Sequence, residues 1–129
     1  MFDPPPHLSL PLGREATAPR QARAGIRRLL GGRASDEFVE DAQLLTSELV
    51  TNAVMYTPTG CRVSAWYVAA AKALRVEVAD GASDVPCVRS PSAPSHLGGR
   101  GLQLVAARST DWGVQASPTG KSVWFELRR

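Results

Sequence analysis

Alternating apolar and polar residues predict strands near both ends and in the middle of the chain. Residues 8–12 predict a short edge strand, because Pro11 cannot donate a hydrogen bond to a central ladder. Further strands are predicted by the alternating stretches 62–69, 74–79, 111–116 and 122–127. The links from 62–69 to 74–79 and from 111–116 to 122–127 are short, which is typical of hairpins.

Helical spacing of apolar residues predicts two helices after the first strand. The first covers residues 19–30, with a proline in its first turn and a glycine pair after its end. The second covers residues 36–56, and either Ser35 or Asp36 can cap it. Its apolar side, which we expect to face the core, consists of Phe38, Ala42, Leu45, Leu49 and Ala53.

A Ser/Pro-rich segment, residues 80–98, interrupts this regular pattern. Loops of that length in a compact domain are usually functional or disordered. The glycine-rich stretch Gly98-Gly-Arg-Gly101 follows it. After these glycines, a third helix is predicted by the apolar residues Leu102, Leu104, Val105 and Ala106.

The order strand, helix, helix, strand, strand, loop, helix, strand, strand indicates an α+β fold. We expect a two-layer sandwich, with helices packed on one face of a mixed, mainly antiparallel sheet. A Rossmann unit is excluded, since strands and helices do not alternate throughout. Residues 1–7 are expected to form a loose N-terminal tail, and residues 8–129 a single domain.

Composition and net charge indicate which classes of binding partner the chain can have. The chain is 43% apolar, as globular proteins are, and its net charge is +3. The N-terminal quarter is rich in arginine, which indicates either a solvated helix face or a surface for an acidic partner. Neither a zinc-finger spacing nor an RNA-binding aromatic signature accompanies it, so we expect no direct contact with nucleic acid. These arginines are Arg14, Arg20, Arg23, Arg27, Arg28 and Arg33.

Cysteine content and hydropathy indicate a soluble cytoplasmic protein. Cys61 and Cys87 are too few for a disulfide framework and lack a metal-ligand spacing. The Pro-rich start has no apolar signal core, and no apolar run approaches the ~18 residues of a membrane span. We therefore expect no membrane contact.

Candidate chemistry begins on the second predicted helix. Glu48 and Asn52 lie four positions apart, so they share one helix face, and Tyr56 extends the same line. A carboxylate and an amide oxygen at the edge of an apolar side can serve Mg²⁺, which takes few protein ligands. Taken alone, the pair is better described as an exposed polar edge of a core helix.

Two further features lie later in the chain. Asp80 ends a predicted strand, where its carboxylate can accept a hydrogen bond from an exocyclic amine such as that of adenine. Gly81 permits close approach of a ligand to the backbone, although an Asp-Gly pair is also a common turn. The glycines of Gly98–Gly101, placed before a helix, leave N–H groups that can point at phosphate oxygens.

The three features in this order resemble the motifs of the GHKL (Bergerat-fold) ATPases. Within them, the chain is most similar to the bacterial anti-sigma-factor serine kinases, which are related to histidine-kinase ATPase domains. Residues 47–54 resemble the N box, 78–86 the G1 box and 98–105 the G2 box, and 120–127 resemble the closing strand. The resemblance covers roughly residues 10–128.

The resemblance implies a role for each matching position. Asn52 would hold Mg²⁺ against the phosphates of ATP, and Glu48 would be the general base for an attacking serine hydroxyl. Asp80 and Gly81 would bind adenine, and residues 82–98 would form the ATP lid. The remaining nucleotide-binding residues would be Gly99, Arg100, Gly101 and Leu102.

The resemblance further implies an anti-sigma-factor serine/threonine protein kinase. Such a protein binds Mg·ATP, sequesters a sigma factor and phosphorylates an anti-sigma-factor antagonist on serine, and a homodimer is compatible with this role. Tyr56 stands where the N box often has His, and Ala82 stands where the G1 box often has Gly or Ser. These two differences favour an alternative, a non-catalytic ATP-binding module whose nucleotide state sets partner binding.

Overall fold

Helices and strands follow the predicted order along the chain. The computed structural model describes residues 7–56, 60–80, 99–118 and 120–129. The predicted lid, residues 82–98, and Gly81 lie outside these ranges. The elements are β1 (Leu8–Leu12), α1 (Ala18–Leu30), α2 (Asp36–Tyr56), β2 (Cys61–Val68), a 3-10 turn (Ala69–Ala71), β3 (Ala73–Asp80), α3 (Gly99–Arg108), β4 (Asp111–Ser117) and β5 (Gly120–Arg128).

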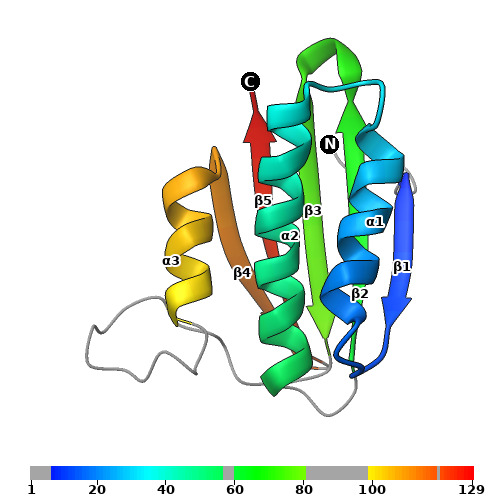
Figure 1. Ribbon diagram of the computed structural model, residues 1–129. Coiled ribbons are helices and arrows are strands. Elements are labelled where there is room, and N and C mark those ends of the chain that lie inside the picture. Colours follow the sequence, from blue (N-terminus) through cyan, green and yellow to red (C-terminus); the bar gives the residue numbers. More distant parts are fainter. Residues whose placement is uncertain (1–6, 57–59, 81–98, 119) are drawn as a thin grey trace.

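The strands form one sheet in the order β1-β2-β3-β5-β4 (Figure 1). Every pairing between the described strands is antiparallel. This arrangement confirms the predicted α+β sandwich. The position of β1 at the edge of the sheet confirms the edge strand that was predicted from Pro11. His7 continues the pairing of β1, since its N–H donates to the carbonyl oxygen of Ala65 at 2.9 Å.

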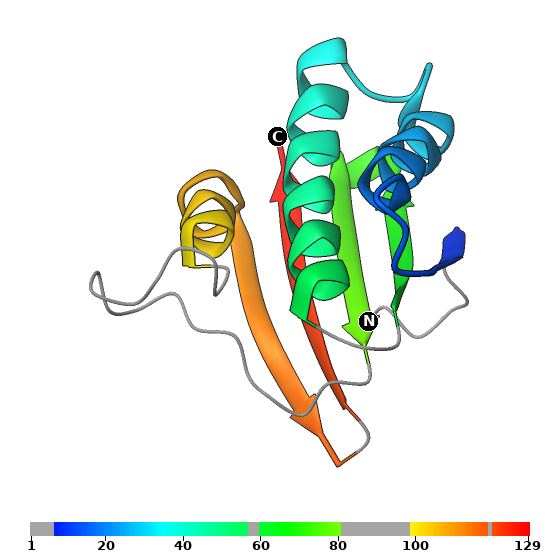
Figure 2. The same cartoon turned by 60° about the horizontal axis from the view of Figure 1, so that its bottom comes forward.

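All three helices cover the same face of the sheet (Figures 1 and 2). The helix α2 packs against α1 on one side and α3 on the other, and it contacts β2 and β3 beneath it. The core between the layers is apolar, because every second residue of each strand points toward the helices. Its fully buried members include Ile26, Leu30, Leu45, Val50, Val63, Leu74, Val76, Phe125 and Leu127.

The helix α2 has a defined start and a continuous buried side. Ser35 caps it, with its hydroxyl oxygen accepting a hydrogen bond from the N–H of Phe38 at 3.2 Å. Leu45 and Leu49 are almost completely buried. Burying a leucine side chain contributes roughly 1.5–3 kcal/mol, so these contacts outweigh the intrinsic propensities of the helix.

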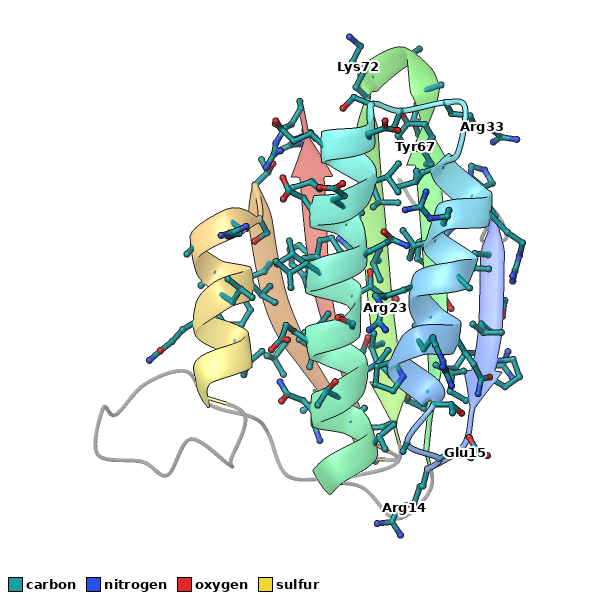
Figure 3. All side chains as sticks on the ribbon, viewed as in Figure 1. Arg14, Glu15, Arg23, Arg33, Tyr67 and Lys72 are labelled. Atoms are coloured by element: carbon teal, nitrogen blue, oxygen red, sulfur yellow. The ribbon has the colours of Figure 1, made fainter. Side chains whose placement is uncertain are left out.

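At one end of the molecule, Tyr67 of β2 contacts the α1–α2 connection and the start of α2 (Figure 3). Its hydroxyl donates to the carbonyl oxygen of Arg33, in the α1–α2 connection, at 3.4 Å. Its ring packs against Phe38 at the start of α2, with 6.0 Å between centroids. Lys72, in the left-handed region at φ 50°, closes the β2–β3 hairpin at this end. The opposite end contains the C-terminal ends of α2 and β3 and the N-terminal end of α3 (Figure 1).

The other face of the sheet carries charges and aromatic rings. Arg75 on β3 forms ion pairs with Glu77 at 2.8 Å and with Glu126 of β5 at 2.9 Å. Its guanidinium group also lies 4.2 Å from the ring centroid of Trp124. These contacts join adjacent strands, because Arg75 is the register partner of Glu126 and Glu77 that of Trp124.

We expect Thr46→Val to raise the free energy of unfolding by about 1 kcal/mol. Thr46 lies in α2 with no exposed surface, and its hydroxyl has no hydrogen-bond partner among the described residues. Valine keeps the β-branched shape and a similar helix propensity while removing the unsatisfied polar atom. Urea unfolding followed by circular dichroism measures the change.

Thr51→Val is the matched control, because Thr51 is a half-buried residue of the same helix. Water can still solvate its hydroxyl, so the substitution should change stability much less. A destabilised Thr46→Val protein would show that the hydroxyl forms a hydrogen bond in solution.

Candidate functional site

A small pocket lies where α2, β3, α3 and β5 come together at the lower end of Figure 1. Its volume is about 30 Å³. Among the residues expected to act in binding, Asn52 of α2, Asp80 of β3 and Leu102 of α3 contribute to its wall. The complete set of described lining residues is Leu49, Asn52, Ala53, Val78, Asp80, Leu102, Lys121 and Val123.

Strand alternation brings two charged residues into this pocket. Asp80 follows the buried positions Val76 and Val78 of β3 at spacings of two, so it lies on the helix-facing side. Lys121 stands in the same relation to Val123 on β5, and it is the register partner of Asp80. The carboxylate and the ammonium group therefore share the last inward row of the sheet.

Asp80 and Lys121 form a buried ion pair. The Nζ atom of Lys121 lies 3.4 Å from Oδ1 of Asp80, and the side chains are 9% and 2% exposed, respectively. Sequence reasoning identified Asp80 but missed Lys121. The available signal was its spacing from Val123, Phe125 and Leu127, which places a lysine on the buried side of a strand.

Asn52 contributes an amide to the same pocket. Its Nδ2 atom is buried and has no hydrogen-bond partner among the described residues. Leaving a buried donor unsatisfied costs roughly 1–3 kcal/mol. An oxygen atom of a ligand would remove this cost, so the amide fits a ligand that carries phosphate or hydroxyl oxygens.

Glu48 lies one helical turn before Asn52 and is half-buried. It is not among the described residues that line the pocket. Its place on the α2 face that includes Asn52 agrees with the predicted spacing of four residues. This geometry does not test the predicted part of Glu48 in catalysis, which stays a prediction. The side chain of Tyr56 lies outside the described part of the chain.

The start of α3 corrects one expectation. The glycine-rich stretch was predicted to precede the helix, but α3 begins at Gly99, so Gly99, Arg100 and Gly101 form its first turn. The first N–H groups of a helix have no intrahelical partner, so they are available to a ligand. Those N–H groups and the helix dipole still suit a phosphate group near this turn.

Metal binding at this site would depend on few protein ligands. The described ranges contain no group of three or more His, Cys, Asp or Glu side chains that could hold a metal ion. Asn52 can offer one amide oxygen, and Mg²⁺ characteristically takes one or two protein ligands together with phosphate and water oxygens.

No helix in these ranges is long and apolar enough to cross a membrane.

Cys61 lies beside the ion pair, and the pKa of its thiol responds to the charge of Asp80. It is the register partner of Asp80 on β2 and is 9% exposed. Burial, and secondarily the negative charge of Asp80, raises the pKa of the Cys61 thiol from 9.0 to about 11. The thiol is therefore protonated and unreactive near neutral pH.

Residues 14–127 match the family described as the histidine kinase-like ATPase domain. No curated protein matches the chain. Two solved structures share the fold. One contains the RsbU and RsbW domains of Rv1364c from Mycobacterium tuberculosis, with a TM-score of 0.71 and 23% identity over 97% of this chain and 32% of that one.

The second is the Erythrobacter litoralis EL346 blue-light activated histidine kinase. It has a TM-score of 0.53 and 22% identity, covering 91% of this chain and 41% of that one. The present chain therefore spans less than half the length of either structure. At such identities, these likenesses establish the fold alone.

We expect Asp80→Asn to lower the pKa of Cys61 from about 11 while leaving it above 9.0, since burial, the larger cause, persists. The alkylation rate by iodoacetamide, followed by mass spectrometry across alkaline pH in a Cys87→Ser background, measures the shift. Glu77→Gln, on the other face of the sheet, is the control and should leave the rate profile unchanged. Identical profiles with and without the Asp80→Asn substitution would show that the carboxylate carries no charge felt at Cys61.

Proposed function

The chain belongs to the histidine kinase-like ATPase domain family, and from this premise we propose that it is an ATP-binding regulatory protein with serine/threonine protein kinase activity. The observation that carries the proposal is the convergence of Asn52 and Asp80 in one pocket beside the first turn of α3. A polar residue for each end of a nucleotide is thereby held on a separate, rigid element.

The base end of the proposed site is built on β3 and α3. Asp80 would accept a hydrogen bond from the exocyclic amine of adenine, with its carboxylate held at the end of the strand. Leu102 and Val78 would pack against the base, since both are buried apolar lining residues. Gly81 follows Asp80 directly in the chain and would allow the ligand to approach the backbone.

The phosphate end would use Asn52 and the start of α3. The unpaired Nδ2 of Asn52 supports donation to a phosphate oxygen, and its amide oxygen would hold Mg²⁺ against the phosphates. Gly99, Arg100 and Gly101 would present backbone N–H groups to phosphate oxygens. When bound, Mg·ATP supplies the transferable γ-phosphoryl group and neutralises part of its charge.

Glu48 is the proposed general base. Its carboxylate would take the proton of a partner's serine hydroxyl as the hydroxyl oxygen attacks the γ-phosphorus, and ADP would leave. The half-buried place of Glu48, one turn from Asn52, supports a position facing the phosphate side of the site.

The proposed protein substrate is an anti-sigma-factor antagonist, and a sigma factor is the proposed second partner. The proposal is compatible with a cytoplasmic location and with a homodimer. The likeness to a structure that contains an RsbW domain supports this assignment. The exposed arginines of α1, including Arg20, Arg27 and Arg28, would suit an acidic partner surface.

A second candidate is a non-catalytic ATP-binding module. Two observations favour it: Glu48 lies off the described pocket, and Tyr56 stands where related N boxes often have a histidine. In this alternative, Mg·ATP binding alone would set the affinity for the partner. The two candidates share the pocket and differ only in whether phosphate is transferred.

We expect the wild-type chain to bind Mg·ATP and Asn52→Ala to weaken binding by at least about tenfold, because a hydrogen bond or ligand bond to a charged group is lost. Isothermal titration calorimetry measures both affinities. Thr51→Ala, at the neighbouring half-buried position of α2, should bind as the wild type does. A wild-type protein that binds no nucleotide at millimolar concentration would refute both candidate functions.

We expect Glu48→Gln to reduce phosphate transfer to a cognate antagonist by about 10²-fold or more while nucleotide affinity stays within about threefold, because glutamine cannot act as a base. Transfer of radiolabelled phosphate from ATP under single-turnover conditions measures the rate. Glu40→Gln, an exposed site of α2, is the control. Absence of transfer by the wild type, despite ATP binding, would leave the non-catalytic module as the function.

A further inference from the structure

We propose that Lys121 is a base-reading residue that donates a hydrogen bond to the ring nitrogen N1 of adenine while Asp80 accepts one from the adjacent amine. This inference rests on the proposed nucleotide site and extends it. It assigns a specificity-determining role to a residue that lies on the closing strand, β5, outside the three motifs.

The position of Lys121 is the first step. Asp80 and Lys121 are register partners on the helix-facing side of the sheet, and both line the pocket. Their side chains are 2% and 9% exposed, so bulk water cannot compete strongly for either group. Any ligand edge that reaches Asp80 in this pocket also meets the ammonium group of Lys121.

The second step concerns the donors of Lys121. An ammonium group has three N–H bonds, of which one direct contact to Asp80 uses one. The Nζ to Oδ1 distance of 3.4 Å is longer than the ~2.8 Å of a strong charge-assisted hydrogen bond. The pair thus leaves donor capacity on Lys121 for a ligand acceptor.

The third step is complementarity. A carboxylate beside an ammonium group presents an acceptor next to a donor. The Watson–Crick edge of adenine presents the reverse, a donor amine next to the acceptor N1. A base placed with its amine toward Asp80 therefore brings N1 toward Lys121, and both buried charges gain a partner.

The surroundings of the ion pair suit the edge of a flat base. The remaining wall near the pair is apolar, with Val78, Leu102 and Val123 on the lining. Because a buried ion pair is by itself a weak stabiliser of a fold, a ligand-binding use accounts better for these two charges in an apolar wall.

The test compares Mg·ATP with 1-deaza-ATP, which keeps the exocyclic amine and replaces N1 by C–H. We expect the wild type to bind 1-deaza-ATP roughly tenfold or more weakly, the size of a hydrogen bond to a charged group. Lys121→Met should bind the two nucleotides within about twofold of each other, since the donor is gone. Calorimetry measures all four affinities, and circular dichroism checks the fold.

Lys72→Met is the matched control, because it removes a lysine from the opposite end of the molecule (Figure 3). It should discriminate between the nucleotides as the wild type does. Lys121→Met leaves Asp80 buried without its ion-pair partner, which can prevent folding. In that case the double variant Asp80→Asn with Lys121→Met removes both charges, and its ratio of affinities should fall to about two or less.

The outcomes separate this inference from the proposed function. A wild type that binds both nucleotides equally, or a Lys121→Met protein that still discriminates tenfold, overturns the role of Lys121 while ATP binding stands. A substitution that weakens both nucleotides by the same factor also overturns that role, because it shows a purely structural ion pair. A wild type that binds neither nucleotide refutes the site itself.

Discussion

The packing of α2 against the centre of the sheet is the constraint on which the site depends. Its buried side, with Leu45 and Leu49, rests over β3, the strand that carries Val76 and Val78. Because packed interiors tolerate little displacement, this contact fixes the height and rotation of the helix. Asn52, three residues beyond Leu49, is consequently held near the end of β3, where both helix and strand line the pocket. A ligand site between a helix and a strand needs such a fixed spacing.

Polar groups appear where the apolar core ends. Along β3 and β5, inward positions are apolar until the last row, where Asp80 and Lys121 replace them and Cys61 completes the row on β2. The charged side chains of this row are more costly to bury than apolar side chains unless they form hydrogen bonds or ion pairs. The ion pair satisfies part of that requirement. The same row is therefore both the end of the core and the chemical wall of the pocket.

Much of this arrangement was predictable, and the failures have physical causes. The bounds of α2 were predicted correctly because its apolar period is long, and each strand was placed within one or two residues. The first turn of α3 was mistaken for a loop, since glycines are poor helix formers and yet suit a first turn. Lys121 was missed because alternation was applied to apolar residues only. The shared pocket of Asn52 and Asp80 could be inferred only from a motif resemblance, because periodicity within single elements contains no distance between them.

The relation between Asn52 and Glu48 has a consequence for how such a domain can evolve or lose activity. Both belong to α2, but one lies in the pocket wall and the other lies a turn away from it. Under the proposed function, substitution of Glu48 need not disturb the contacts that Asn52 would make with the nucleotide, whereas any rotation of α2 that repositions Glu48 must move Asn52 as well. Nucleotide binding could then persist without phosphate transfer, but a movement of the helix that alters transfer would also alter binding. In such a site, catalytic capacity is most easily changed by side-chain replacement at Glu48 rather than by changes in the packing of the fold.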